Sequence, residues 1–355
     1  MIILGSTGSI GVNTLKVVDK FSLHVETLVA GTNIELLNQQ IQKYKPTYVC
    51  VATKELSKQV KHNNVYFGSS GILKVIELSK SDLVVNALVG FVGLAPTIKT
   101  LELGKKLALA NKESLVVAGH LLDCSKITPI DSEHFGLWYL QNGREISKMT
   151  IMASGGAFRD TPLEELASQT PTQALKHPNW SMGNKITIDS ATMTNKLFEL
   201  LEAKWLFDMN HVDAIMETGS VVHAMIDFKD GSSTAHLAGA DMQLPIAYAL
   251  LGKVDTPIVN HIDLLKVGSL EFREIKSDRY PIWEIKESLL QNPHRGVVVN
   301  AANEIAINKF FKNELNILEL AEFTKKAYRH FEDVNPKSLD DIFEIDKEVR
   351  LYCSL

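Results

Sequence analysis

A glycine-rich turn close to the start of the chain restricts the possible folds more than any other stretch. Residues 2–4 (IIL) have the pattern of a short buried strand, residues 5–11 (GSTGSIG) follow at once, and residues 12–18 predict a helix. Glycines between a strand and a helix let the backbone approach a pyrophosphate, which the N–H groups at the helix start can bind. The chain is therefore predicted to begin with a dinucleotide-binding domain.

Strands and helices continue to alternate after this turn. Short apolar runs at residues 25–30, 49–51, 83–85 and 107–110 predict buried strands with helices between them, and residues 90–94 form a second glycine turn before a helix. Alternation at this spacing predicts an α/β domain with a Rossmann-like, doubly wound parallel sheet. Such a sheet gathers its ligands at the carboxyl edge of the strands.

The end of the second predicted strand bears on the choice of nicotinamide cofactor. A site for NAD usually carries an acid there for the ribose 2′-hydroxyl, but this strand ends in residues 31–33 (GTN). NADP is therefore the predicted cofactor, although no Arg or Lys stands at that tip. Residues 111–113 (NKE), at the end of a later strand, are either a polar helix cap or part of the site.

Composition excludes several classes of protein. The net charge of -5 and the lack of a long basic run argue against nucleic acid or an anionic membrane as the main partner. Three scattered cysteines suit neither a disulfide framework nor a zinc site, which favours a reducing compartment. No apolar run could span a bilayer, and the first strand leaves no room for a signal peptide. We therefore expect a soluble, cytoplasmic protein.

A phosphate site is predicted in the middle of the chain. Residues 185–188 have the β-branched pattern of a short strand, which runs into a capped helix. The N–H groups at such a helix start attract phosphate, and Ser190, Asn195 and Lys196 can add hydrogen bonds and charge. Glu199 follows one turn later. The alternative is a capped amphipathic helix with a solvated polar face.

A pair of acids follows another predicted strand. Residues 127–130 run into Asp131 and Glu133, whose carboxylates project to one side of an extended or turning backbone. Two such groups, with Glu199 as a third oxygen ligand, suit a hard cation such as Mg²⁺ or Mn²⁺. The alternative is solvated surface.

Two loops have functional and structural interpretations. Residues 154–156 (SGG) follow a predicted strand, and they either wrap an anion or form an ordinary turn. Residues 177–183 (HPNWSMG) carry a tryptophan that a plain loop would not expose, which favours a lid over a site. The alternative is that Trp180 packs as a satellite of the core.

The later elements give fewer functional signals. Residues 215–226 are predicted as a loop entering a strand, with residues 234–237 as the antiparallel partner across the turn at Asp230-Gly231. His223 is then a strand histidine with satisfied hydrogen bonds, or contributes to catalysis. The domains are predicted in four parts: a nucleotide-binding domain (1–130), an α+β catalytic domain (131–252), a linker (253–278) and a C-terminal helical domain (279–355).

The joint set of motifs closely resembles the 1-deoxy-D-xylulose 5-phosphate reductoisomerase family. The motifs occur in family order over nearly the whole chain: 5–11 (GSTGSIG), 111–114 (NKES), 131–134 (DSEH), 154–156 (SGG), 177–183 (HPNWSMG), 189–193 (DSATM), 195–196 (NK) with Glu199, and 300–304 (NAANE).

The resemblance implies a role for each motif. Mg²⁺ or Mn²⁺ would be held by Asp131, Glu133 and Glu199. NADPH would be bound by Gly5, Thr7, Gly8, Ser9, Ile10, Gly31, Thr32, Asn33, Asn111, Glu113 and Gly183. The substrate would be bound by Lys112, Ser132, Glu133, Ser154, His177, Trp180, Met182, Ser190, Asn195, Lys196 and Glu199. The catalytic residues would be Lys112, Glu133, His177 and His223.

The resemblance also implies the reaction. The enzyme would rearrange and reduce 1-deoxy-D-xylulose 5-phosphate to 2-C-methyl-D-erythritol 4-phosphate in the non-mevalonate isoprenoid pathway, as a homodimer inhibited by fosmidomycin-type phosphonates. Two positions depart from the family pattern. Thr32 stands where the family usually has a basic residue, and residues 217–220 (ETGS) replace a usual His-Pro-Gln-Ser.

Two other functions remain open from the residues. Another NADP-dependent dehydrogenase acting on a small phosphorylated carbonyl compound would use a nucleophilic cysteine or no metal, and none of the three cysteines lies in a site motif. A non-catalytic regulator that senses NADP would have no use for three carboxylates beside a phosphate site.

Overall fold

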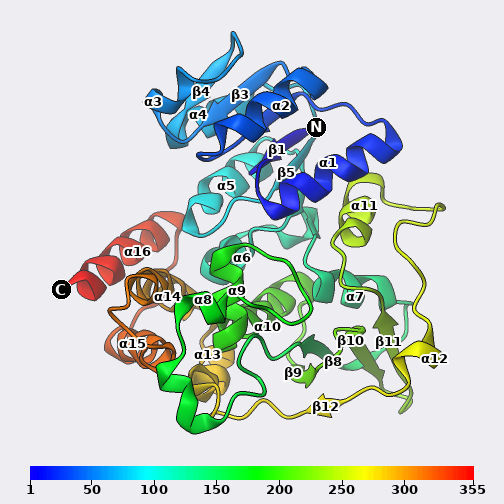
Figure 1. Ribbon diagram of the computed structural model, residues 1–355, viewed down its shortest axis with the longest axis vertical. Helices are drawn as coiled ribbons and strands as arrows, with labels where there is room; N and C mark the ends of the chain where they lie inside the picture. Colours follow the sequence, from blue (N-terminus) through cyan, green and yellow to red (C-terminus); the bar gives the residue numbers. More distant parts are fainter. The chain divides into compact units, whose positions relative to one another are not determined.

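The computed structural model describes all 355 residues, and the chain separates into two units, each described here by itself (Figure 1). The first unit consists of Met1–Ser114, Asp123–Asp131 and Asp241–Val259. The second unit consists of Leu115–Leu122, Ser132–Ala240 and Asn260–Leu355. The four-part division inferred from the sequence stays a prediction.

The first unit is built on a sheet of seven parallel strands in the order β4-β3-β2-β1-β5-β6-β7. The strands are β1 (Ile2–Leu4), β2 (Thr27–Val29), β3 (Tyr48–Val51), β4 (Val65–Phe67), β5 (Leu83–Asn86), β6 (Lys106–Leu109) and β7 (Ile127–Pro129). The helices are α1 (Ser9–Phe21), α2 (Ile34–Tyr44), α3 (Lys54–Ser57), α4 (Gly68–Leu78), α5 (Leu94–Glu102) and α11 (Gln243–Leu251), and α6 (Lys112–Ala118) continues into the second unit.

This topology confirms the predicted doubly wound sheet. The strand order turns back at β1, which pairs with β2 on one side and β5 on the other. Helices cover both faces of such a parallel sheet, and the central strands β1 and β2 are buried throughout. The glycine turn after β1 therefore lies at the switch point of the sheet, where such folds bind their ligands.

The last helix of the first unit comes from far along the sequence. α11 packs against α1, and both lie side by side in Figure 1. Val17 of α1 belongs to the same apolar cluster as Ile246 and Ala247 of α11, together with Val85 of the sheet. Residues 241–259 thus complete the core that the first 131 residues begin.

The second unit contains a mixed sheet in the order β11-β10-β8-β9-β12. Its strands are β8 (Ile146–Ala153), β9 (Val212–Glu217), β10 (Val222–Phe228), β11 (Ser233–Leu237) and β12 (Phe272–Arg273), of which only β8 and β9 pair in parallel. The predicted hairpin across Asp230-Gly231 is confirmed. The prediction of a loop at residue 215 is wrong, because β9 already includes residues 212–217 and turns sharply into β10.

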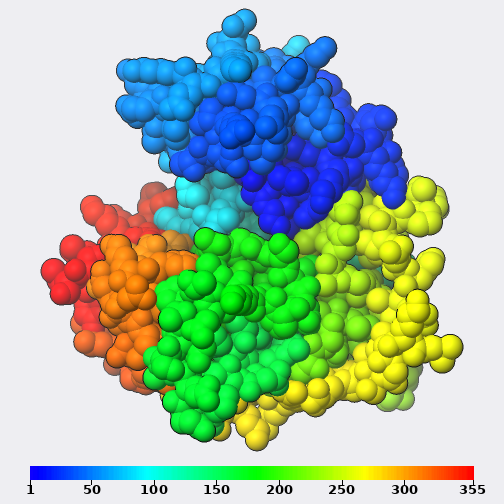
Figure 2. Space-filling view, viewed as in Figure 1, coloured from blue at the N-terminus to red at the C-terminus, as the bar shows by residue number.

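Helices form the rest of the second unit. They are α7 (Ser132–Leu140), α8 (Pro171–Ala174), α9 (Asn184–Thr192), α10 (Thr194–Phe207), α12 (Leu264–Val267), α13 (Lys286–Gln291), α14 (Gly296–Phe311), α15 (Ile317–His330) and α16 (Leu339–Ser354). One apolar cluster joins α9 to α14 and α15. Figure 2 shows the corresponding green and orange surfaces against each other. None of the helices combines the length and apolar character needed to cross a membrane.

The predicted strand at residues 185–188 is wrong, because these residues form the first half of α9. Ile188 and Ala191 pack into the cluster with Phe310, as neighbours on one face of a helix do. Tertiary packing therefore overrides the β-propensity of the local sequence. α9 ends at Thr192, and Met193, with a φ of 71°, turns the chain into α10. A helix rather than a strand therefore precedes the polar residues of α10.

Candidate active site

The glycine turn after β1 leaves its backbone open to a ligand. Gly8 is the N-cap of α1, and no side chain caps this helix. A Cβ on Gly5 would lie 2.5 Å from the carbonyl oxygen of Ala87, and one on Gly11 would lie 2.2 Å from that of Gly5, so both positions require glycine. A Cβ on Gly8 would meet nothing closer than 3.4 Å. The N–H groups at the start of α1 are therefore positioned for a pyrophosphate.

The tip of β2 is exposed, as a site for the adenosine end of a dinucleotide requires. Gly31 and Thr32 are exposed, and a Cβ on Gly31 would meet no atom within 4 Å. Asn33 accepts a hydrogen bond from the N–H of Leu36 and caps α2. No acidic side chain stands at this tip, which favours NADP over NAD.

Asn111 and Glu113 are buried and hydrogen-bonded to each other. The amide of Asn111 donates to Glu113 at 3.0 Å and to the carbonyl oxygens of Leu88 and Gly90, each at 2.9 Å. Asn111 therefore ties the glycine turn after β5 to the start of α6, where it accepts the N–H of Ser114, as in the structural interpretation. A role of this segment in the site stays a prediction.

Lys112 and Asp131 form a buried ion pair in the first unit. Their Nζ and Oδ2 atoms are 3.0 Å apart, and both side chains are largely shielded from solvent. Lys112 is the first residue of α6, and Asp131 follows β7. Two predicted site residues are thus adjacent at the carboxyl ends of β6 and β7.

Glu133 and Glu199 share one lysine in the second unit. Lys196 Nζ donates to Glu133 Oε1 at 3.0 Å and also to Glu199, and all three come from the starts of α7 and α10. Ser132 donates to Glu133 at 2.5 Å, and Asn195 donates to Glu199 at 2.5 Å. The two carboxylates therefore converge on a single positive charge, which is also what a bound cation would provide.

Three of the predicted phosphate residues, Ser154, His177 and Ser190, lie around the loop after β8. Ser154 Oγ and His177 Nε2 are 2.7 Å apart. Gly155 and Gly156 have φ values of 88° and 71°, and a Cβ on Gly156 would lie 2.6 Å from the carbonyl oxygen of Ser190. Glycine is therefore required for the loop to approach the end of α9. Ser190 lies in the last turn of α9 and is not the predicted N-cap, because α10 starts four residues later.

The hydrogen bonds of His177 define its tautomer. Its Nδ1 accepts the N–H of Asn179 at 3.1 Å and that of Trp180 at 3.0 Å. The proton of the neutral ring is therefore on Nε2, which donates to Ser154 Oγ. Burial, with the nearby charge of Arg159, lowers the pKa of His177 to about 4, so the ring is neutral at pH 7.

The predicted lid contacts the β9–β10 turn. Asn179 Nδ2 donates to the carbonyl oxygen of Thr218 and to Ser220 Oγ, both at 2.8 Å. The ring of Trp180 meets that of His223 edge-on at 5.9 Å. His223 Nε2 lies 3.2 Å from the carbonyl oxygen of Ala238, as in the structural interpretation of this residue. Met182 is half-buried, and Gly183 is the exposed N-cap of α9.

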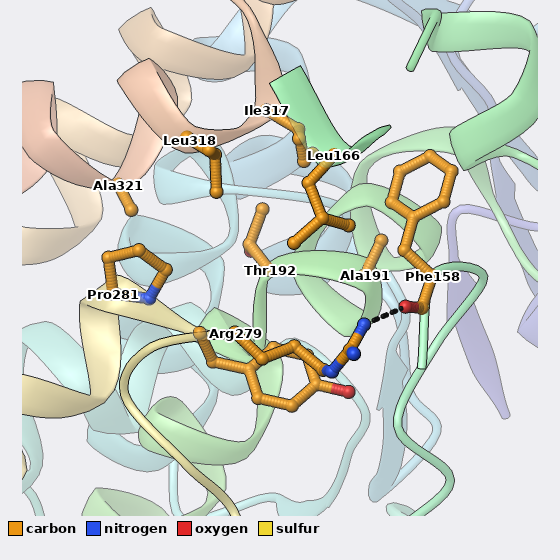
Figure 3. A pocket seen from close by; sticks show the side chains of 10 residues that line it. Phe158, Leu166, Ala191, Thr192, Arg279, Pro281, Ile317, Leu318 and Ala321 are labelled. Carbon is orange, nitrogen blue, oxygen red and sulfur yellow. Dashed lines mark hydrogen bonds between the residues drawn. The ribbon is translucent and has the colours of Figure 1, made fainter. Parts of the chain in front are cut away.

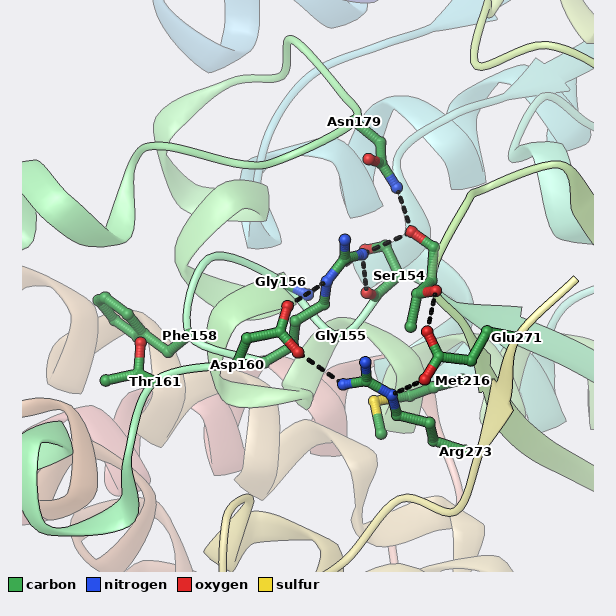
Figure 4. Close-up of polar contacts among 12 residues, drawn as sticks. Ser154, Gly155, Gly156, Phe158, Asp160, Thr161, Asn179, Met216, Glu271 and Arg273 are labelled. Atoms are coloured by element: carbon green, nitrogen blue, oxygen red, sulfur yellow. Dashed lines mark hydrogen bonds and ion pairs between the residues drawn. The ribbon is translucent and has the colours of Figure 1, made fainter. Parts of the chain in front are cut away.

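Sequence reasoning missed Arg159 and Glu217. Arg159 Nη1 donates to the carbonyl oxygens of Ser154 at 2.9 Å and Thr218 at 2.6 Å (Figure 4). Glu217 is buried and accepts the N–H groups of Gly219, Val221 and Val222. The only sequence signal was an arginine shortly after a glycine pair and an acid before a Thr-Gly-Ser turn.

Three sequence models of one family match successive parts of the chain. They describe 1-deoxy-D-xylulose 5-phosphate reductoisomerase (residues 1–119), its C-terminal domain (residues 127–207) and a further DXP reductoisomerase C-terminal domain (residues 237–352). The 1-deoxy-D-xylulose 5-phosphate reductoisomerases of Nautilia profundicola and Wolinella succinogenes are 54% and 50% identical to the chain, and each comparison covers 99% of both sequences.

Solved structures give the same result. A DOX-P reductoisomerase in complex with NADPH, fosmidomycin and magnesium is 31% identical, with a TM-score of 0.94 over 99% of this chain and 97% of that one. The Zymomonas mobilis 1-deoxy-D-xylulose 5-phosphate reductoisomerase in complex with NADPH is also 31% identical, with a TM-score of 0.89 over the same shares.

Proposed function

The chain belongs to the 1-deoxy-D-xylulose 5-phosphate reductoisomerase family, and from this premise we propose how its own residues perform the reaction. The enzyme converts 1-deoxy-D-xylulose 5-phosphate to 2-C-methyl-D-erythritol 4-phosphate, and it depends on NADPH and a divalent metal ion.

Asp131, Glu133 and Glu199 hold the divalent cation in this proposal. The observation that carries it is the single ammonium of Lys196 between Glu133 and Glu199. Asp131, two residues before Glu133, is paired with the ammonium of Lys112 in the same way. Each of these three carboxylates accepts a hydrogen bond from an ammonium group. A hard cation such as Mg²⁺ or Mn²⁺ fits the same place, because it prefers oxygen ligands and supplies the positive charge that balances the carboxylates.

NADPH binds at the turn after β1 and at the tip of β2. The uncapped start of α1 fits its pyrophosphate, and the open space at Gly8 and Gly31 leaves room for it. When bound, the cation polarises the ketone and hydroxyl oxygens of the substrate, and NADPH supplies the hydride.

Ser154, His177, Ser190 and Lys196 bind the substrate phosphate. Because His177 Nε2–H donates to Ser154 Oγ, the hydroxyl proton of Ser154 is directed to another acceptor, which is a phosphate oxygen in this proposal. Lys196, near the start of α10, supplies positive charge to the phosphate in this proposal. The phosphate does not react, so its binding orients the carbon chain at the metal.

Asn195 and the lid complete the substrate site. Asn195 Oδ1 is buried without a hydrogen-bond partner, and it accepts from a substrate hydroxyl in this proposal. Trp180 and Met182 cover the substrate and keep water from the polarised carbonyl. Fosmidomycin-type phosphonates bind in the same place in this proposal, and a related enzyme of known structure is in complex with fosmidomycin.

The activity is tested by following NADPH oxidation in the presence of the phosphorylated ketose. We expect turnover with Mn²⁺ or Mg²⁺ and none after chelation, and turnover that survives exhaustive chelation would contradict the metal assignment. We further propose a cytoplasmic homodimer. Light scattering after size-exclusion chromatography tests the dimer, and a monomer mass at enzyme concentrations that give full activity would contradict it.

A further inference from the structure

Five residues around the β9–β10 turn form a closed ring of hydrogen bonds and ion pairs, which Figure 4 shows. The ring runs from Arg159 to Asp160, Arg273, Glu271 and Thr218, and back to Arg159. Its members come from the loop after β8, from the β9–β10 turn, and from β12 and the residue before it. None of them belongs to the proposed metal, phosphate or cofactor residues.

Arg159 connects this ring to residues 154–156, which we call the phosphate loop. One nitrogen, Nη1, donates both to the carbonyl oxygen of Ser154 and to that of Thr218, while Nε pairs with Asp160 at 3.2 Å. A Cβ on Gly155 would lie 2.7 Å from Cβ of Arg159, so the loop packs tightly against this side chain. Arg159 therefore fixes the backbone that carries the Ser154 hydroxyl.

The carbonyl oxygen of Thr218 also binds the predicted lid. Thr218 accepts from Asn179 Nδ2 at 2.8 Å as well as from Arg159 at 2.6 Å, so two donors occupy the two lone pairs of one oxygen. The position of Thr218 thus affects both the lid and the phosphate loop.

The ring also holds Thr218 in place. Its hydroxyl donates to Glu271 Oε2 at 3.2 Å, and its N–H donates to the carbonyl oxygen of Glu271 at 3.3 Å. Arg273 ties Glu271 to Asp160 with contacts of 2.8 and 2.6 Å. The segment around β12, expected to be only a linker, thus supplies two of the five residues.

We propose that Arg159 is a positioning residue for the reaction, which sets the Ser154 hydroxyl and the closed lid together through the carbonyl oxygen of Thr218. It touches neither the substrate nor the reacting atoms. The inference rests on the proposed phosphate role of Ser154 and His177, and it adds that the phosphate loop and the lid are coupled. Loss of Arg159 releases both.

The test compares Arg159→Gln, Asn179→Ala and the double variant by steady-state kinetics with the phosphorylated ketose, at saturating NADPH and Mn²⁺. Each single change is expected to raise KM about tenfold, with a much smaller effect on kcat, because misplaced binding groups mainly weaken substrate binding. The double variant is expected to raise KM by less than the product of the two single increases, because both residues donate to the same carbonyl oxygen. NADPH affinity, measured by fluorescence, should not change.

Arg279→Gln is a matched control. Arg279 donates to the carbonyl oxygen of Phe158 at 2.8 Å (Figure 3) and to that of Thr161, on the same loop, at 2.7 Å. No hydrogen bond joins it to Ser154 or Thr218. It lines a small pocket against Leu166 and Ile317. This variant should lose thermal stability but keep its KM. An equal rise of KM in Arg279→Gln, or independent effects in the double variant, would overturn the proposal.

Two further variants distinguish a failure of the Arg159 proposal from a failure of the proposed phosphate site. Arg159→Lys preserves the charge and one carbonyl contact, so its KM should lie between those of the wild type and Arg159→Gln, and a KM equal to that of Arg159→Gln would count against the proposal. Ser154→Ala tests the proposed function directly. If Ser154→Ala leaves KM unchanged, the phosphate assignment fails, whatever Arg159→Gln does.

Discussion

His177 is engaged at both ring nitrogens, and this makes the lid sensitive to acid. Burial holds its pKa at about 4, against 6.5 for an ordinary histidine. Between these values the folded protein binds fewer protons than the unfolded chain, so this contribution to stability is present above pH 6.5 and is lost as the pH falls towards 4. A protonated ring cannot accept the N–H groups of Asn179 and Trp180.

We therefore expect the lid to open between about pH 6.5 and pH 4 in the ligand-free enzyme. The fluorescence of Trp180 reports the change after subtraction of the signal of a Trp180→Phe variant. His177→Gln is the control, because burial also lowers the pKa of His236 to about 4 and only the His177 component should vanish. An unchanged transition in His177→Gln would contradict the assignment.

Glu199 is a second residue with a sharp test. Glu199→Gln removes one carboxylate charge beside Lys196, and we expect Mn²⁺ affinity to fall by at least about tenfold. Calorimetric titration of Mn²⁺ in the presence of substrate measures it. Glu287→Gln, on an exposed side chain of α13, should bind the metal as the wild type does. Equal affinities in the two variants would refute the assignment of Glu199.

Thr32 stands exposed at the tip of β2, where the family usually carries a basic residue. Thr32→Arg should strengthen NADPH binding by about 1–3 kcal/mol, if the guanidinium forms a charge-assisted hydrogen bond with the 2′-phosphate. NADH lacks that phosphate and serves as the control ligand. Fluorescence titration measures the affinity for both cofactors. An equal strengthening of NADH binding would show that Thr32 does not face the 2′-phosphate.

Side chains of the site could be predicted where chemistry and spacing coincide. Glu133, Glu199 and Lys196 were found because acids and a lysine at strand and helix ends suggest metal and phosphate, and the structure brings these three together. Arg159 was missed, because its proposed function depends on hydrogen bonds to backbone carbonyl oxygens of residues that are far apart in the sequence. No local pattern records which carbonyl oxygen an arginine reaches.

The β9–β10 turn is one of the two places where the sequence departs from the family pattern. In place of His-Pro-Gln-Ser, this chain has Glu217, whose buried carboxylate accepts three backbone N–H groups and closes the turn. The turn that carries Thr218 is therefore held from inside by one side chain. Removal of a charged acceptor leaves buried donors unsatisfied.

Glu217→Gln should therefore lower the free energy of unfolding by about 1–3 kcal/mol, since an amide nitrogen would face N–H donors. The midpoint of denaturant unfolding measures the loss. Glu271→Gln, on an exposed carboxylate at the other side of the turn, should cost less. A Glu217→Gln variant as stable as the wild type would contradict this account of the turn.

Elements were predicted well where pattern and packing agree. Six strands of the parallel sheet are short apolar runs, and their positions followed from the sequence. β4 was not predicted, because its residues are only partly buried and lack that pattern. α9 was mistaken for a strand, because its β-branched residues meet a helical environment set by α14 and α15. These packing partners are more than a hundred residues away from α9 in the sequence, so a prediction from the local sequence does not take them into account.

At the scale of the whole molecule, the class of fold was predictable and the grouping of segments was not. A glycine turn in alternating strands and helices led to the doubly wound sheet, which is confirmed. α11 comes from a segment more than a hundred residues after the rest of the first unit. Its partner, however, is α1, and only the three-dimensional contact between them reveals it.

This contact separates the order of synthesis from the order of folding. On the ribosome, α1 and the parallel sheet emerge first, but the cluster around Val17 lacks Ile246 and Ala247 until residues 241–259 have been made. Contacts of such high sequence separation form late, and an apolar helix face that waits for its partner is a natural substrate for chaperones. The nucleotide-binding half of the enzyme is therefore begun first but completed only after most of the intervening catalytic segment has been translated.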